Sequence, residues 1–149
     1  MPKPNATTST PCACTTVKKV SRALGRRYDA ALAGSNLSVT QFAVLRRIQR
    51  LAGEPLSHVA RELEMDRTTL YRAVSPMARD GWLTLTEGMN ARSRSAALTP
   101  KGERLLSRAS QRCDGLNARV ISAFGRGKWE ALLGELTRLA ACAEAAADV

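Results

Sequence analysis

The chain has little of what membrane proteins and most enzymes require. Its apolar runs extend over only a few residues before Arg or Glu interrupts them, whereas a membrane-spanning helix needs about 20 apolar residues. Aromatic residues make up 4% of the 149 residues, and His58 is the single histidine, so acid–base catalysis has few candidate groups. The sequence also lacks a glycine-rich phosphate loop and a nucleophile elbow. We therefore expect a protein that is not an enzyme, needs no cofactor and binds no membrane.

An apolar leader is also missing from the first 14 residues, MPKPNATTSTPCAC, so we expect the protein to remain in the cytoplasm. The four cysteines are Cys12, Cys14, Cys113 and Cys142. Thiols stay reduced in that compartment, and a chain with 44% hydrophobic residues can build a core without disulfides. The Cys-x-Cys spacing of the first pair differs from the Cys-x-x-Cys of structural zinc sites, which argues against a metal site.

The composition has a large excess of basic over acidic residues. The 23 Lys and Arg exceed the 13 Asp and Glu, which gives a formal net charge of +10. An excess of this size in a small chain indicates a polyanionic partner such as nucleic acid. The excess is greatest in the first third of the sequence, so the charge alone does not locate the binding site.

Helical periodicity dominates the first half of the chain. Residues 1–11 are Pro, Thr, Ser and Asn without periodicity, which predicts a disordered arm. Apolar residues then recur at helical spacing over 17–34, and Ser38-x-x-Gln41 has the form of a capping box before a second helix over about 40–51.

A helix-turn-helix pattern follows. Ser57 is expected to cap a short third helix, and Asp66 a fourth helix that begins at Arg67 and closes at Gly81. The stretches WLTLT and AALT alternate as strands do, with the basic, turn-rich EGMNARSRS between them. These two strands predict a wing.

The last third predicts two helices. Thr99 is expected to cap the first of them, with Pro100 at its first helical position, and GRGK is expected to separate it from a helix beginning near Trp129. Their apolar faces, like that of residues 17–34, exceed what a winged helix of this size can cover. Burial against a second copy of the chain is the economical solution, which predicts a homodimer.

The expected fold is thus mainly α with a small β wing. Residues 12–149 are predicted to form one domain, in which residues 38–99 are the winged helix-turn-helix DNA-binding region and residues 17–34 and 101–147 are dimerisation helices. In such folds the N-terminal residues of the second helix of the motif face base edges in the major groove. The expected DNA contacts are Arg67, Thr68, Thr69 and Arg72 of that helix and Arg92 and Arg94 of the wing.

Pro76 stands in the middle of the predicted fourth helix. A proline removes a backbone hydrogen bond and crowds the preceding turn, at a cost of about 3 kcal/mol in a helix interior. One hypothesis is that the DNA-reading half ends before Ser75 and the remainder tilts to pack under the wing. The alternative is that tertiary contacts offset the proline.

The order of elements and several motifs resemble the MarR family of winged-helix transcriptional regulators. The motifs are LSVTQF in the second helix, MARDGWL before the wing and LTPKG after it. The resemblance implies a homodimeric repressor of palindromic double-stranded DNA operators that is released by a small, possibly aromatic, ligand or by an oxidant. One departure is Asn90, which stands where the family usually has an Asp that orients the wing arginine, here Arg92.

Two triggers remain open. A ligand pocket would be lined by Tyr28 and Phe42. The spacing of Cys14 and Tyr28 around Ser21 resembles the hydroperoxide-sensing branch of the family, which implies a thiol switch at Cys14 with Cys12 or Cys113 as the second thiol, although Val39 replaces a tyrosine of that branch. Lys18, Lys19 and the helix N-terminus are expected to lower the pKa of Cys14.

Three other classes of protein are alternatives to a ligand- or oxidant-controlled transcriptional regulator. A winged helix used only for protein contact would show no salt-dependent DNA binding. A thiol peroxidase would turn over peroxide steadily, and a metal sensor would use the Cys12 and Cys14 thiolates together with His58.

Overall fold

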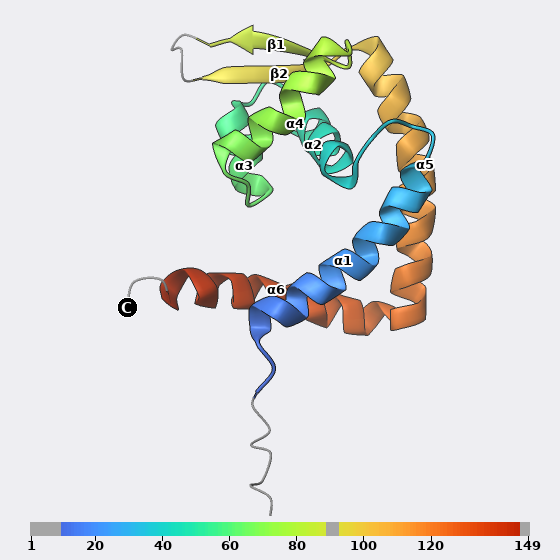
Figure 1. The fold of residues 1–149 in the computed structure, drawn as a ribbon, viewed down its shortest axis with the longest axis vertical. Helices are drawn as coiled ribbons and strands as arrows, with labels where there is room; N and C mark the ends of the chain where they lie inside the picture. Colours follow the sequence, from blue (N-terminus) through green and yellow to red (C-terminus); the bar gives the residue numbers. More distant parts are fainter. Residues whose placement is uncertain (1–9, 89–92, 147–149) are drawn as a thin grey trace, which may run out of the picture.

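A computed structural model describes residues 10–88 and 93–146. Two parts are visible in Figure 1: a helix-turn-helix unit with its wing above, and long helices that extend below it. Among the described residues, no helix combines the length and the apolar character that crossing a bilayer requires. The elements are α1 (Ala13–Leu32), α2 (Val39–Arg50), α3 (Leu56–Glu62), α4 (Arg67–Arg79), β1 (Leu83–Glu87), β2 (Arg94–Leu98), α5 (Pro100–Phe124) and α6 (Arg126–Ala145).

Side-chain caps set the starts of three helices, as predicted. Ser38 and Gln41 form the reciprocal capping box of α2. The carboxylate of Asp66 accepts a hydrogen bond from the backbone N–H of Thr69 at the start of α4. The Thr99 hydroxyl accepts from the backbone N–H of Gly102 at the start of α5. These caps are local, which is why the sequence reveals them.

Gly81 ends α4 in a left-handed conformation, with φ of 75°. The N–H groups of Gly81 and Trp82 donate to the carbonyls of Ala78 and Met77, at 3.0 and 2.9 Å. This turn buries Trp82 and directs the chain into β1.

One apolar core joins α2, α3, α4, the wing and the first half of α5. Leu70, Val74 and Met77 of α4 are at most 1% exposed, as their helical spacing predicts. The other side chains that are nearly fully buried are Leu32, Val44, Leu45, Ile48, Leu56, Val59, Leu106 and Cys113. The core therefore holds α4 by one face and leaves the opposite face exposed.

The wing is a two-stranded antiparallel sheet with Leu83 paired to Leu98 and Glu87 paired to Arg94. Leu83 and Ala96 point into the core, and an isolated bridge between Pro55 and Ser95 ties β2 to the segment before α3. These contacts fix the base of the wing next to α4. The predicted tip residues Asn90 and Arg92 lie outside the described residues.

Several predicted boundaries are wrong. Helix α1 begins at Ala13 rather than near residue 17, with Cys12 as its N-cap. Pro55, not Ser57, is the N-cap of α3, and it provides no side-chain cap. Helix α6 begins at Arg126, so only Gly125, with φ of 101°, separates it from α5. These ends lack the polar caps from which helix starts are read.

Pro76 does not end α4, which runs unbroken to Arg79. The helix is therefore continuous through Ser75 and Pro76, and the proposed division between a DNA-reading half and a tilted second half stays a prediction. Met77, one residue after the proline, is fully buried, and the helix packs against β1. Core contacts of this kind can offset the lost backbone hydrogen bond.

Candidate DNA-binding surface

The exposed face of α4 begins at a capped N-terminus. Asp66 accepts hydrogen bonds from the Thr69 backbone N–H at 2.8 Å and from the Thr69 hydroxyl at 2.6 Å. These hydrogen bonds, the one from the Thr69 hydroxyl above all, hold the pKa of Asp66 below its usual value. The predicted base contact Thr69 therefore uses its hydroxyl proton within the protein, which leaves its methyl group and oxygen lone pairs for DNA.

The wing and α4 share one hollow of about 670 Å³. Its lining includes the predicted contacts Arg67, Thr68, Arg72 and Arg94. Of the described residues that line it, none is acidic, so the arginine charges are presented together. This geometry suits a polyanion that lies across the helix and the wing.

Three further polar residues line the hollow: Tyr71, Ser75 and Arg79. None of the three was among the DNA contacts expected from the sequence. Together with Arg67 they recur every four residues, so they lie on one face of α4. This four-residue spacing could have indicated from the sequence alone that Tyr71, Ser75 and Arg79 share a face with Arg67.

Arg94 was predicted at a flexible wing tip, but it is the first residue of β2. Its guanidinium lies 3.1 Å from the Glu87 carboxylate on the facing strand. Both side chains are well exposed, so the pair contributes little to stability, but it orients Arg94 along the wing.

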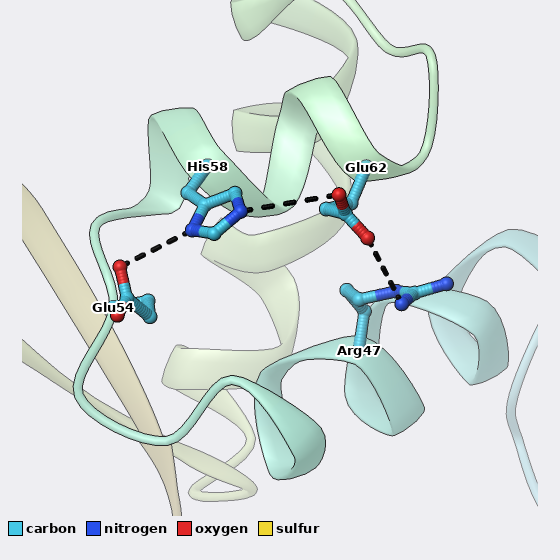
Figure 2. Close-up of polar contacts among 4 residues, drawn as sticks. All are labelled: Arg47, Glu54, His58 and Glu62. Carbon is cyan, nitrogen blue, oxygen red and sulfur yellow. Dashed lines mark hydrogen bonds and ion pairs between the residues drawn. The ribbon is translucent and has the colours of Figure 1, made fainter.

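A polar cluster links α3, the first helix of the motif, to its neighbours (Figure 2). Figure 2 shows the His58 ring between two carboxylates: Nδ1 lies 3.2 Å from Glu54 Oε2, and Nε2 lies 3.9 Å from Glu62 Oε1. Glu62 in turn accepts a hydrogen bond from Arg47 of α2 at 3.2 Å. The two ring nitrogens face different carboxylates, so the cluster connects helices and does not converge on one metal ion.

The lower part of the molecule leaves apolar side chains uncovered. Helix α6 has no buried residue, and it crosses below α1 in Figure 1. The exposed large apolar side chains of α1, α5 and α6 are Val17, Val20, Phe124, Leu133, Leu136 and Leu139. A single chain therefore does not bury the faces predicted to form a dimer.

Comparison with known structures identifies the family. The transcriptional regulator MosR of M. tuberculosis, solved in complex with DNA, is 36% identical over 90% of this chain and 97% of its own, with a TM-score of 0.80. The chain belongs to the MarR family. Its members are transcriptional regulators and not enzymes. Neither the family models nor the curated protein sequences gave a match.

Other MarR-family structures show the same fold. A second crystal structure of MosR is 33% identical over 91% of this chain and 97% of its own, with a TM-score of 0.77. PcaV of Streptomyces coelicolor, solved with its natural ligand, is 18% identical over 94% and 97%, also with a TM-score of 0.77. The mainly α fold with a two-stranded wing predicted from the sequence is thus confirmed.

The MarR-family chain also brings the predicted effector residues Tyr28 and Phe42 together. They line a hollow of about 390 Å³ with Arg46 of α2. The Tyr28 hydroxyl donates to Asn117 Oδ1 at 3.1 Å, and burial, followed by the charges of Cys113 and Asp114, raises the pKa of that hydroxyl. The Arg46 guanidinium lies 5.4 Å from the centre of the Phe42 ring and 2.6 Å from Asp114.

All four cysteines are described and are free thiols, and Cys142 is exposed on α6. The three cysteines considered for a thiol trigger lie in two different settings. Cys12 and Cys14 are exposed at the start of α1, where hydrogen bonds from the backbone and hydroxyl of Thr15 lower the pKa of Cys12. Cys113 is 1% exposed, and burial raises its pKa.

The two settings are far apart within one chain. Cys14 lies 14 residues before Tyr28 on one helix, or about 21 Å at 1.5 Å per residue. Tyr28 lies close enough to Cys113 for their charges to interact. A disulfide needs Cα atoms less than about 7 Å apart, so Cys14 and Cys113 of the same chain cannot pair without a large movement of α1.

Proposed function

We propose that this MarR-family regulator is a homodimeric repressor that binds a palindromic double-stranded DNA operator. The N-terminal turns of α4 would enter the major groove, with the two copies about 10 bp apart, and the wings would flank them. The observation that carries the proposal is the acid-free hollow in which Arg67 and Arg72 of α4 meet Arg94 of β2. The DNA complex of the related MosR supports the same class of partner.

Base reading and backbone binding would be divided between the two elements. Arg67 and Arg72 project from the exposed face of α4, where a guanidinium can make two hydrogen bonds with guanine. Arg94, held along the wing by Glu87, is better placed for phosphate or the minor groove. Thr68 and Thr69 would add contacts to a thymine methyl group or a base edge.

The test begins with selection of bound duplexes from a random pool. The affinity for the selected operator is then compared for wild type, Arg67→Ala, Arg72→Ala and, as control, Arg104→Ala, an exposed arginine on α5 outside the hollow. We expect each α4 variant to cost about 1 to 3 kcal/mol of binding, and the control to bind as wild type.

Intact operator binding by both α4 variants would refute the site. Absence of salt-dependent binding to any duplex would instead support a winged helix used for protein contact. For wild type, log K should fall with log salt at about −0.9 per neutralised phosphate.

For the trigger, we propose a small aromatic ligand with an anionic group in the hollow of Tyr28 and Phe42. The volume of about 390 Å³ lies in the range of small-molecule sites. An anion there would compete with Asp114 for Arg46, and thereby alter a link between α2 and α5. Because α2 packs against α4, a shift of α2 reaches the reading helix. Loss of operator binding with an aromatic carboxylate, abolished in Arg46→Ala, tests this trigger.

A thiol trigger is the second candidate, and the lowered pKa of Cys12 favours it. A thiolate attacks a hydroperoxide oxygen, an alcohol leaves, and the sulfenic acid condenses with a second thiol with loss of water. The structure adds Cys12 to the predicted Cys14 as a candidate nucleophile. Loss of DNA binding with peroxide that persists in Cys12→Ser and in Cys14→Ser would eliminate this trigger.

A further inference from the structure

A further hollow of about 870 Å³ lies away from both sites described above. One wall is the turn between α1 and α2, which passes beside α5 in Figure 1. The other walls are the first half of α5 and the chain just after α4, at Asp80 and Trp82. No lining residue is shared with the hollow of α4 and the wing or with that of Tyr28 and Phe42. It is therefore a separate feature, which we call the α5 hollow.

Three cations line the α5 hollow from one side. Lys101, Arg108 and Arg112 are spaced by seven and four residues, so they lie on one face of α5 and span about 16 Å along it. Asp80 is the one carboxylate among the described lining residues. The lining thus carries an excess of positive charge, which no function proposed above requires.

The two outer cations are held in place by backbone carbonyls. Lys101 Nζ donates to the Asp80 carbonyl at 2.8 Å, and Arg112 Nη1 donates to the Ala33 carbonyl at 3.2 Å. A carbonyl orients a cation but does not neutralise its charge. Within the described residues, Arg108 makes no hydrogen bond or ion pair, although it stands between the two held cations. The α5 hollow is therefore positively charged, and two of its three cations are held in fixed positions while their charges are not neutralised by the described residues.

The opposite wall offers a neutral donor. Gln41 uses its side-chain oxygen to accept from the Ser38 N–H in the capping box of α2. Its amide NH₂ group is thereby left to donate toward a ligand. Trp82 and Leu105 add apolar surface between the polar groups. Cations, an amide donor and apolar surface together suit an organic anion better than an inorganic ion.

We propose that the α5 hollow binds a small organic molecule with two or more negative charges, carried by carboxylate or phosphate groups. Arg108 is the principal anchor, and Lys101 and Arg112 bind the outer charged groups. Arginine binds both kinds of anion through its paired N–H donors, so the geometry defines the charge of the ligand and not its acid group. Because the ligand would bridge α5 to the turn after α1 and to the end of α4, it would stiffen the junction between the two parts of the molecule.

The test uses the full chain at low ionic strength with citrate, pyrophosphate and ADP as probes, and NaCl at matched ionic strength as the control. The chain has two tryptophans, Trp82 in the hollow and Trp129 on α6, so their indole N–H signals in NMR report on two separate places. We expect at least one probe to shift the Trp82 signal saturably and leave that of Trp129 unchanged. Binding of citrate alone would identify carboxylate as the preferred acid group. Binding of pyrophosphate or ADP but not of citrate would identify phosphate.

Variants assign the binding to the hollow. Arg108→Ala should weaken probe binding at least tenfold, because it removes the principal anchor. Among residues 10–88 and 93–146, Arg108 has no hydrogen-bond or ion-pair partner whose loss would unfold the chain. The matched control Arg104→Ala, on the same helix but outside the hollow, should bind as wild type, as should Arg72→Ala on the DNA surface. Equal weakening in Arg104→Ala, loss of binding only in Arg72→Ala, or shifts that NaCl reproduces would each overturn the proposal.

Discussion

Gly102 of α5 packs directly against the carbonyl of Trp82, so closely that a Cβ added to the glycine would collide with that oxygen. The same carbonyl accepts a hydrogen bond from the Thr99 N–H at 3.0 Å. This contact joins the start of α5 to the end of α4, and so sets where the wing stands relative to the reading helix. It also gives a physical reason for the glycine in the LTPKG motif.

Gly102→Ala should therefore lower the free energy of unfolding by about 1 to 3 kcal/mol, as overpacking does. The neighbour is a backbone atom and cannot move aside as a flexible side chain would. Gly115→Ala on the same helix is the matched control, since its nearest neighbour there is an Arg119 side-chain atom at 3.8 Å. Urea denaturation measures both variants. Equal stability of the two would show that the contact is not tight.

The cap of α4 predicts a stability change in acid. The folded pKa of Asp66 is lowered, so its contribution is complete above the unfolded value of about 3.9 and is lost as pH falls through the folded pKa. Asp66→Asn keeps a hydrogen-bond acceptor but cannot titrate. Thermal unfolding of wild type and variant from pH 6 to pH 2.5 should show a difference that shrinks below about pH 4. A difference constant with pH would contradict the role of the carboxylate.

The ion pair of Arg94 with Glu87 in the wing predicts that loss of Arg94 weakens binding to all DNA sequences alike. Arg94→Ala should weaken binding to all duplex sequences by a similar factor, because a phosphate contact carries no base preference. The magnitude of the salt slope should fall by about 2, since the proposed dimer would lose one phosphate contact in each protomer. Arg72→Ala should instead relax the preference for the selected operator. Competition binding at several salt concentrations separates the two. A change in base preference with Arg94→Ala would place Arg94 at a base edge.

The exposed leucines of α6 predict a change of oligomeric state. Leu136 is 39% exposed in the single chain, and Leu136→Glu would place a charge in the proposed dimer interface. We expect monomers in sedimentation equilibrium and loss of high-affinity operator binding. Arg138→Ala, exposed on the opposite face of α6, should remain a dimer. Wild type that sediments as a monomer would refute the dimer itself.

The cysteines should differ in reactivity. Hydrogen bonds from Thr15 lower the pKa of Cys12, so more of this exposed thiol is thiolate near neutral pH. Iodoacetamide should modify Cys12 early and the buried Cys113 last, with Cys113 becoming reactive only on unfolding. Mass spectrometry of timed samples gives the order. Early labelling of Cys113 would show that the α5 face around it opens in the native state.

Much of the fold was predictable because it depends on local signals. The capping box of Ser38, the cap at Asp66 and the apolar stripe of Leu70, Val74 and Met77 each lie within a few residues, so the sequence predicts them directly. The predicted starts of α1 and α6 were wrong because their N-caps, Cys12 and Gly125, are not among the Ser, Thr, Asp and Asn residues that mark a helix start in a sequence.

The sequence by itself determined the helix-turn-helix, the wing and the residues that α4 turns outward, since these follow from periodicity and capping. Only the tertiary structure decided which distant groups meet. It brought Arg94 beside Arg72, paired Tyr28 with Asn117 and aligned the α5 cations with the turn after α1. The reason is that such meetings depend on how whole helices cross and pack, which the core decides and no local pattern encodes.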